Sequence, residues 1–211
     1  CNRLRSLLLP LLLPLLLPLL LPLLLLHSAT SPDLCSAVEM ICDFRLASKA
    51  SGRCFELLGE GSRKKVYRIK WHKSDAALLI PKAGILEEAE VMLMARAKAA
   101  TNLVTMLDHF ERIFVVVERA PFGSIVDYAD TLEFLGEILS SHQRAQVLAD
   151  ARCGVEQLNE LGFRHGDLRA RNVLLFALHP MLAKLGDFGE AAPGRTAECE
   201  VQRLQNEVLA L

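Results

Sequence analysis

The apolar residues of this chain change their spacing halfway along it, and this change constrains the fold more than any other feature. From residue 54 onward, short apolar runs are typical of β-strands; they lie at 54–58, 66–69, 77–80, 104–110 and 113–117. One stretch among them, 86–100, has apolar residues at three- and four-residue spacing, which indicates a helix. We therefore expect an antiparallel sheet that carries one helix.

The second half of the chain has a helical pattern. Ser140 and Gln143 have the spacing of a capping box, and the apolar residues that follow recur on one face until Gly162, which is placed to end the helix. Two short apolar runs, 173–175 and 183–185, precede a final helical segment that begins near residue 200. The sequence predicts an α+β chain with a sheet lobe at 54–118 and a mainly helical lobe at 119–211.

The amino-terminal segment has a different composition. Residues 7–26 contain only Leu and Pro, basic residues precede them at Arg3 and Arg5, and small or polar residues follow at 28–31. This order fits a secretory signal, and the tract is long enough for a signal anchor, which needs about 20 apolar residues. Proline at every fourth position also fits a low-complexity repeat with no targeting role. We expect a leader at 1–31, which would place the protein in the secretory pathway with possible membrane anchoring, and a linker at 32–53; without a signal the protein would be cytoplasmic.

Charge and cysteine content exclude some classes of function. The formal net charge is -1, which gives no general attraction to nucleic acid. The six cysteines form no CxxC pair and no Cys/His cluster with zinc spacing, so we expect no zinc site.

The polar string HGDLRARN at 165–172, followed by DFG at 187–189, carries the chemistry of the chain. Phosphoryl transfer needs one carboxylate to orient the attacking hydroxyl and further oxygen ligands to hold magnesium against phosphates. Asp167 can orient the hydroxyl, and Asn172 and Asp187 can hold the metal. Arg169 is placed to stabilise the transferring phosphate.

These motifs resemble the catalytic loop and the DFG segment of protein kinases, and the sequence LRARN is similar to that of tyrosine-kinase loops. The resemblance runs from about Cys54 to the end of the chain, with the motifs in the expected order. It implies a bilobal protein kinase-like fold with a partial C-lobe. It also implies ATP and Mg²⁺ as cofactors, and a protein hydroxyl of Ser, Thr or Tyr as acceptor.

A glycine loop precedes the second strand. Gly59 and Gly61 would let backbone amides approach phosphates, and Val66 would cover the adenine ring. Lys64 stands where the family usually has a third glycine, which resembles the with-no-lysine kinases and some secretory-pathway kinases. Lys82, in the third strand, stands at the position of the ordinary phosphate lysine. The resemblance therefore leaves open which of the two lysines contacts the phosphates.

Further site residues follow from the resemblance alone. Glu90 fits the helix glutamate that pairs with the phosphate lysine. Val117 resembles the gatekeeper, Glu118 and Ala120 belong to the hinge that would hold adenine, and Leu174 matches the adenine floor.

Two other functions remain open. Gly166 replaces the arginine of the usual His-Arg-Asp, so we expect no switch through a phosphorylated activation segment. The same glycine resembles small-molecule or glycan kinases of the aminoglycoside and choline type, although these commonly lack a basic residue at the position of Arg169 and a full DFG. A pseudokinase is the third reading, favoured by the missing third glycine and disfavoured by the presence of Asp167, Asn172 and Asp187.

Overall fold

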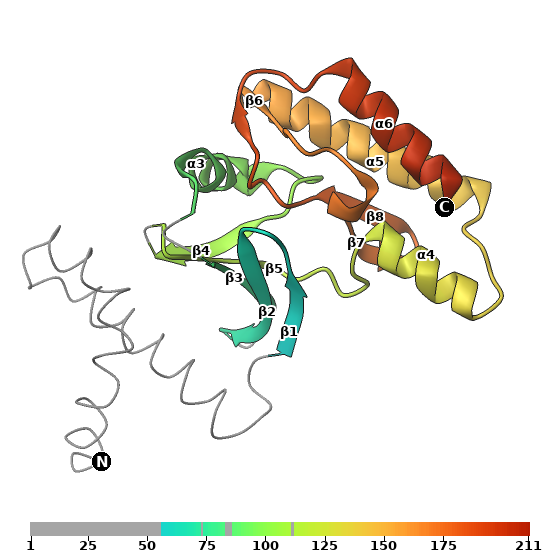
Figure 1. Cartoon of the computed structure of the whole chain (residues 1–211), viewed down its shortest axis with the longest axis horizontal. Helices are drawn as coiled ribbons and strands as arrows, with labels where there is room; N and C mark the ends of the chain where they lie inside the picture. Colours follow the sequence, from blue (N-terminus) through green and yellow to red (C-terminus); the bar gives the residue numbers. More distant parts are fainter. Residues whose placement is uncertain (1–55, 73, 83–85, 111) are drawn as a thin grey trace, which may run out of the picture. The chain divides into compact units, whose positions relative to one another are not determined.

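The computed structural model describes residues 56–72, 74–82, 86–110 and 112–211. Residues Cys54–Leu211 form one compact unit, whose helices and strands are shown in Figure 1. The leader expected at 1–31 and the linker expected at 32–53 lie outside the described residues, so both stay predictions. Within the described part of the chain, none of the helices is long and apolar enough to cross a bilayer.

The first lobe is a five-stranded antiparallel sheet with the order β1-β2-β3-β5-β4. Its strands are β1 (Glu56–Glu60), β2 (Lys64–Trp71), β3 (Ser74–Pro81), β4 (Met106–Phe110) and β5 (Phe114–Glu118). The central strands β3 and β5 are rich in buried apolar residues, which favours a central place in the sheet. One helix, α3 (Glu88–Arg96), continues as a 3₁₀ turn at Ala97–Ala99. The predicted sheet with one helix is confirmed.

The turn between β1 and β2 is tighter than the sequence indicated. We expected a glycine loop from Gly59 to Val66, but β2 already begins at Lys64, which pairs with Pro81 of β3. The Gly61 amide donates to the Lys64 carbonyl at 3.0 Å and closes the turn. As a result Lys64 belongs to a strand, where the pleat determines the direction of its side chain.

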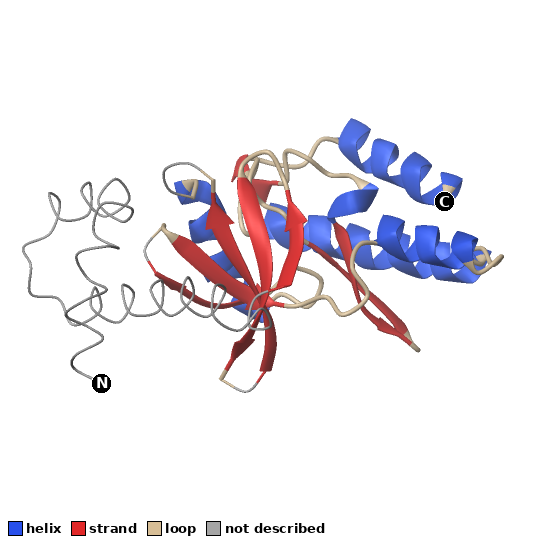
Figure 2. Ribbon diagram, turned by 60° about the horizontal axis from the view of Figure 1, so that its bottom comes forward, coloured by secondary structure: helices blue, strands red, loops and turns tan. Residues whose placement is uncertain are grey.

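The second lobe is mainly helical, and Figure 2 shows its helices grouped beside the strands of the first lobe. They are α4 (Ile125–Phe134), α5 (Ser141–Glu160) and α6 (Glu198–Ala210). Two short antiparallel pairs lie between α5 and α6, formed by β6 (Phe163–Arg164) with β9 (Ala192–Pro193) and by β7 (Val173–Leu178) with β8 (Met181–Leu185). The α+β fold with a sheet lobe and a mainly helical lobe is confirmed.

Helix starts follow local chemistry in this lobe. The capping box predicted at Ser140 and Gln143 is present: the Ser140 hydroxyl accepts from the Gln143 amide at 3.2 Å. Helix α4 was not predicted, although it has the same signal in Ser124 and Asp127, which also form a capping box.

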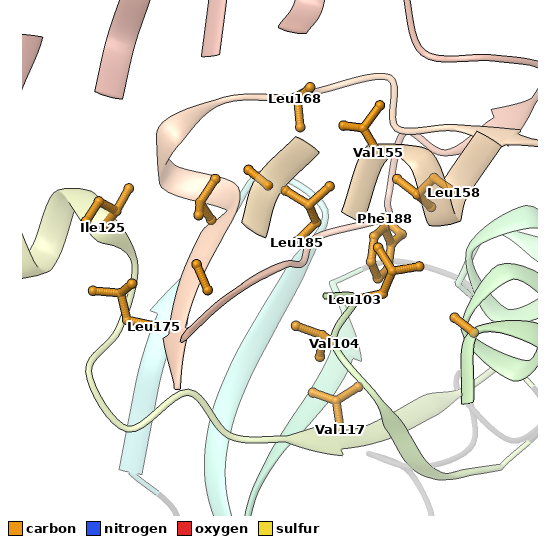
Figure 3. Packing of buried hydrophobic residues seen from close by; sticks show 14 of the residues in the cluster. Leu103, Val104, Val117, Ile125, Val155, Leu158, Leu168, Leu175, Leu185 and Phe188 are labelled. Carbon is orange, nitrogen blue, oxygen red and sulfur yellow. The ribbon is translucent and has the colours of Figure 1, made fainter. Parts of the chain in front are cut away.

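One continuous apolar cluster joins the two lobes and holds the DFG segment in place. Leu103 bridges to Leu185 just before that segment, and both side chains are fully buried. Figure 3 shows Phe188 beside Leu103 and Leu158 within this cluster. Because Leu185 and Phe188 are both buried, the backbone is anchored in the core before and after Asp187.

Candidate active site

The loop between β6 and β7 carries Asp167, Arg169 and Asn172, as the sequence predicted. Its last residues form a 3₁₀ turn, Ala170–Asn172. The buried Asn172 amide donates to the Asp167 carbonyl at 2.8 Å and to its carboxylate at 3.3 Å. A guanidinium nitrogen of Arg169 lies 3.9 Å from the same carboxylate oxygen. These three side chains are therefore brought together.

His165 supports this loop from inside. The ring is fully buried; its Nε2 lies 3.1 Å from the Gly186 carbonyl, and its Nδ1 lies 3.4 Å from the Asp167 amide nitrogen. A neutral ring that carries its proton on Nε2 satisfies both contacts. Burial lowers the pKa of His165, and the Gly186 carbonyl and the nearby carboxylates only partly oppose this. A structural role fits this residue, because it links the catalytic loop to the residue before Asp187.

Lys64, Glu90 and Asp187 form a charged network at the centre of the site. The Lys64 side chain, 10% exposed, extends from β2 to the carboxylate of Glu90 on α3, which is 3% exposed. It also lies 2.8 Å from Asp187 Oδ1. Burial by itself lowers the pKa of Lys64, but the two carboxylates outweigh burial and raise it. Burial likewise raises the pKa of Asp187, and Lys64 more than reverses this, so the pKa is lowered and the carboxylate is ionised.

Lys82 occupies a different environment. Its ammonium pairs with Glu60 at 2.7 Å, and its side chain is 34% exposed. The structure therefore joins Lys64, and not Lys82, to Glu90 and Asp187. Pro81, the residue before Lys82, is the last residue of β3. There the strand ends, so little of the ladder follows the missing donor.

The network lies in a cavity of about 350 Å³ between the two lobes. Gly61 and Lys64 of the sheet lobe and Asp167 and Asp187 of the helical lobe all line it. A Cβ at Gly59 would meet no heavy atom within 4 Å, and at Gly61 it would meet only the Lys64 carbonyl at 3.8 Å. The protein's own side chains therefore leave room beside this turn, as a phosphate-binding loop requires.

Arg63 and Glu190 also line the cavity, although the sequence analysis did not predict either of them as a site residue. Arg63 donates to the Gly189 carbonyl at 3.1 Å and pairs with the Glu190 carboxylate at 2.7 Å. No motif indicated this contact, because it joins a turn of the sheet lobe to the segment after DFG across a large sequence separation.

The predicted adenine-site residues are dispersed over both lobes. Val117 is buried in β5, and Val66 and Leu174 pack against the same apolar cluster from β2 and β7. The Glu118 carboxylate accepts from the Thr105 amide and from Lys184, each at 2.7 Å. Ala120 lies in the connection to α4, where its carbonyl accepts from the Gly123 amide at 3.5 Å.

A steric contact that the sequence did not show explains why residue 166 is glycine. Its φ is +83°, and a Cβ there would lie 2.1 Å from the Glu190 carbonyl oxygen. The segment after DFG therefore occupies the space that an arginine side chain would need at this position.

The donor set of the site fits magnesium that is shared with phosphates. Asn172 and Asp187 offer amide and carboxylate oxygens, which are hard ligands. Among the described residues there is no group of three or more His, Cys, Asp or Glu side chains that could hold a metal ion. Two protein ligands suit Mg²⁺, because this ion commonly takes its remaining ligands from phosphates and water.

Comparisons with known proteins agree with this geometry. A sequence model of the family described as protein tyrosine and serine/threonine kinase matches residues 53–208. The chain is similar to the tyrosine-protein kinase Shark of Drosophila melanogaster, at 34% identity over 59% of this chain and 13% of the relative. It is also similar to the serine/threonine-protein kinase Nek5 of Mus musculus, at 28% identity over 64% of this chain and 22% of the relative.

A third relative is the serine/threonine-protein kinase cst-1 of Caenorhabditis elegans, at 29% identity over 64% of this chain and 27% of the relative. The matches thus cover about a quarter or less of the relatives' own lengths. From the family match, the motifs and the bilobal fold together, we conclude that this chain belongs to the protein tyrosine and serine/threonine kinase family.

Proposed function

We propose that the protein is an ATP-dependent protein kinase that transfers the γ-phosphate to a hydroxyl group of a protein, on Ser, Thr or Tyr. The observation that carries this proposal is the network of Lys64, Glu90 and Asp187, which shares one cavity with Asp167. A buried cation held by two carboxylates, opposite a further carboxylate, is the arrangement that phosphoryl transfer requires.

Lys64 is the better candidate for the phosphate lysine. It is buried and preorganised by Glu90, whereas Lys82 is engaged with an exposed glutamate. A lysine in a fixed position offers its charge to a phosphate without the entropy loss of ordering a flexible side chain. Lys82 lines the same cavity and can contribute a second positive charge.

The remaining residues divide the reaction between them. Gly59, Gly61 and Val66 would cover the nucleotide, and the backbone of Glu118 and Ala120 would bind the adenine edge between Val117 and Leu174. Asn172 and Asp187 would hold magnesium, which neutralises phosphate charge when it is bound.

Asp167 would orient the attacking hydroxyl and accept its proton, while Arg169 would stabilise the phosphoryl group in transfer. The Asp167 carboxylate is suitable for this because the Asn172 amide donates to only one of its oxygens. The amide orients the carboxylate and leaves the second oxygen for the acceptor hydroxyl.

A specific observation also supports a small-molecule or glycan acceptor as the second candidate. Only residues 190–197 separate the DFG motif from α6. Part of this segment pairs with β6, and the Gly194 and Thr196 amides are bonded to Gly162 and Asn159 at 2.9 Å. Few backbone groups of the segment remain to bind an extended peptide by strand addition.

The proposal is tested by the thermal unfolding of the full chain with ATP and magnesium. A ligand that binds the folded state raises the unfolding temperature. We expect a rise for the wild type and none for Asp187→Asn. Asp130→Asn makes the same chemical change at an exposed position on α4 and should keep the rise. A folded wild type without any rise would leave a pseudokinase. If the wild type shows the rise, phosphate incorporation into a generic peptide or into a sugar alcohol separates the two acceptors.

A further inference from the structure

Two side chains of α6 reach the catalytic loop. Arg203 donates from Nε and Nη2 to the Leu168 carbonyl, at 3.3 and 2.9 Å. Glu207, one helical turn later on the same face, accepts from the Ala170 amide at 2.7 Å. Figure 1 shows α6 along α5 and close to the short helical turn of the loop, and contacts join α6 to both. Two backbone groups of the loop, the Leu168 carbonyl and the Ala170 amide, are thus bonded by side chains of this helix.

Arg203 also approaches the carboxylate of Asp167. Its Nη2 lies 4.0 Å from Oδ1, whereas Asn172 and Arg169 are near the other oxygen, Oδ2. The Leu168 carbonyl directly follows Asp167, and the Leu168 side chain is fully buried. A planar guanidinium that donates two N–H groups to one carbonyl has a defined orientation. The positive charge of Arg203 is therefore held beside the Asp167 carboxylate.

We propose that Arg203 is a positioning residue for phosphoryl transfer: it fixes the backbone after Asp167 and holds a positive charge beside Oδ1. This inference rests on the proposed function, because it concerns the same carboxylate. Arg203 acts through Asp167 and Leu168 and makes no contact of its own with nucleotide or acceptor. Glu207 secures the same loop from the next turn of α6.

The reaction step that depends on this geometry can be followed with water as the acceptor. The water oxygen bonds to the γ-phosphorus, the bond from that phosphorus to the bridging oxygen breaks, and ADP leaves. One proton of the water passes to the Asp167 carboxylate, and the other stays on the phosphate that is formed. The products are ADP and inorganic phosphate, so no acceptor has to be identified beforehand.

The test measures phosphate release by the full chain over a range of ATP concentrations with magnesium. Misplacing a reacting group by about 1 Å can cost roughly 100-fold in rate, so we expect Arg203→Gln to lower kcat by about 10- to 100-fold. The KM for ATP should not change, because Arg203 is not among the residues that line the cavity. Arg203→Lys should recover part of kcat, since it keeps the charge and loses the fork.

The matched control is Arg152→Gln. Arg152 of α5 donates to Gln205 of α6 at 2.8 Å, so this change weakens the same helix contact without touching the loop. We expect wild-type kcat for the control. An unchanged kcat in Arg203→Gln refutes the inference, and an equal loss in Arg152→Gln also refutes it, because both would then report only the docking of α6.

Hydrogen exchange of residues 165–172 supplies a readout that does not need turnover. The loop amides should exchange faster in Arg203→Gln than in Arg152→Gln, and equal exchange would overturn the positioning role. A wild type that binds no MgATP or releases no phosphate refutes the proposed function, and the inference with it. That failure is recognised in the wild type alone, before any variant is compared.

Discussion

Lys64→Met removes the cation that two carboxylates of the site share, and we expect it to destabilise the fold as well as to abolish nucleotide binding. The Glu90 side chain is 3% exposed and would keep a buried charge without its partner. Breaking a buried ion pair from one side costs about 3 to 5 kcal/mol. Asp187 is 52% exposed on its side chain, so water can replace Lys64 there at little cost.

The matched change is Lys82→Met. Both members of the Lys82 and Glu60 pair are partly exposed, at 34% and 41%. An ion pair of this kind contributes about 0 to 1 kcal/mol, so the variant should unfold close to the wild type. It should also keep most of the thermal shift with MgATP, because Lys64 remains in place.

A double variant separates stability from function. Lys64→Met combined with Glu90→Met replaces both charges by apolar groups, which is often neutral for a buried pair. It should recover most of the stability that Lys64→Met loses and still show no shift with MgATP. Urea unfolding gives the free energies, and thermal unfolding with and without MgATP gives the binding.

Two results would refute this reasoning. A loss of the MgATP shift in Lys82→Met, with the shift retained in Lys64→Met, would assign the phosphate lysine to the end of β3. A Lys64→Met variant as stable as the wild type would show that the Glu90 carboxylate can be accommodated without a cation.

Three further predictions concern the residues around the site. Gly166→Ala should lower the unfolding free energy by more than about 3 kcal/mol, on the order of the cost of a positive φ plus a severe clash. The added Cβ would lie 2.1 Å from the Glu190 carbonyl oxygen. The control, Gly136→Ala, has φ +75° but no atom within 4 Å of the added Cβ, so it should lose only about 1 kcal/mol in the same urea unfolding. The pKa of His165 is lowered in the folded state, so the unfolded state binds more protons below the ordinary value of 6.5. Stability should therefore be complete above that pH and fall as the pH decreases below it, and a His165→Gln variant whose unfolding free energy falls equally between pH 7.5 and 5 would contradict this. Ser124→Ala removes the cap of α4 and should cost about 1 kcal/mol in unfolding free energy, and a value indistinguishable from zero would show that water replaces the hydroxyl.

Local patterns were enough to predict the order of the elements. The apolar spacing predicts a sheet lobe before a helical lobe, and the capping box at Ser140 predicts where α5 begins, because both signals act within a few residues. The same local signal is present at Ser124, so the start of α4 is also encoded within a few residues. The catalytic loop was also accessible, since Asp167 and Asn172 lie within one short turn whose spacing fixes their proximity.

The remaining features depend on contacts between distant parts of the chain. Lys64 and Lys82 were equal candidates in the sequence, because Lys64 stands in the glycine loop and Lys82 at the family's usual position for the phosphate lysine. The register of β2 with β3 directs Lys64 toward Glu90 and Asp187. The need for Gly166 arises only where the Glu190 backbone passes over it.

The contact of Arg203 with the loop arises only where α6 packs against α5. Residue type and spacing therefore determined the elements and the reacting groups. Packing decided which charged side chains pair with each other, because burial and distance are properties of the folded chain and not of any one segment.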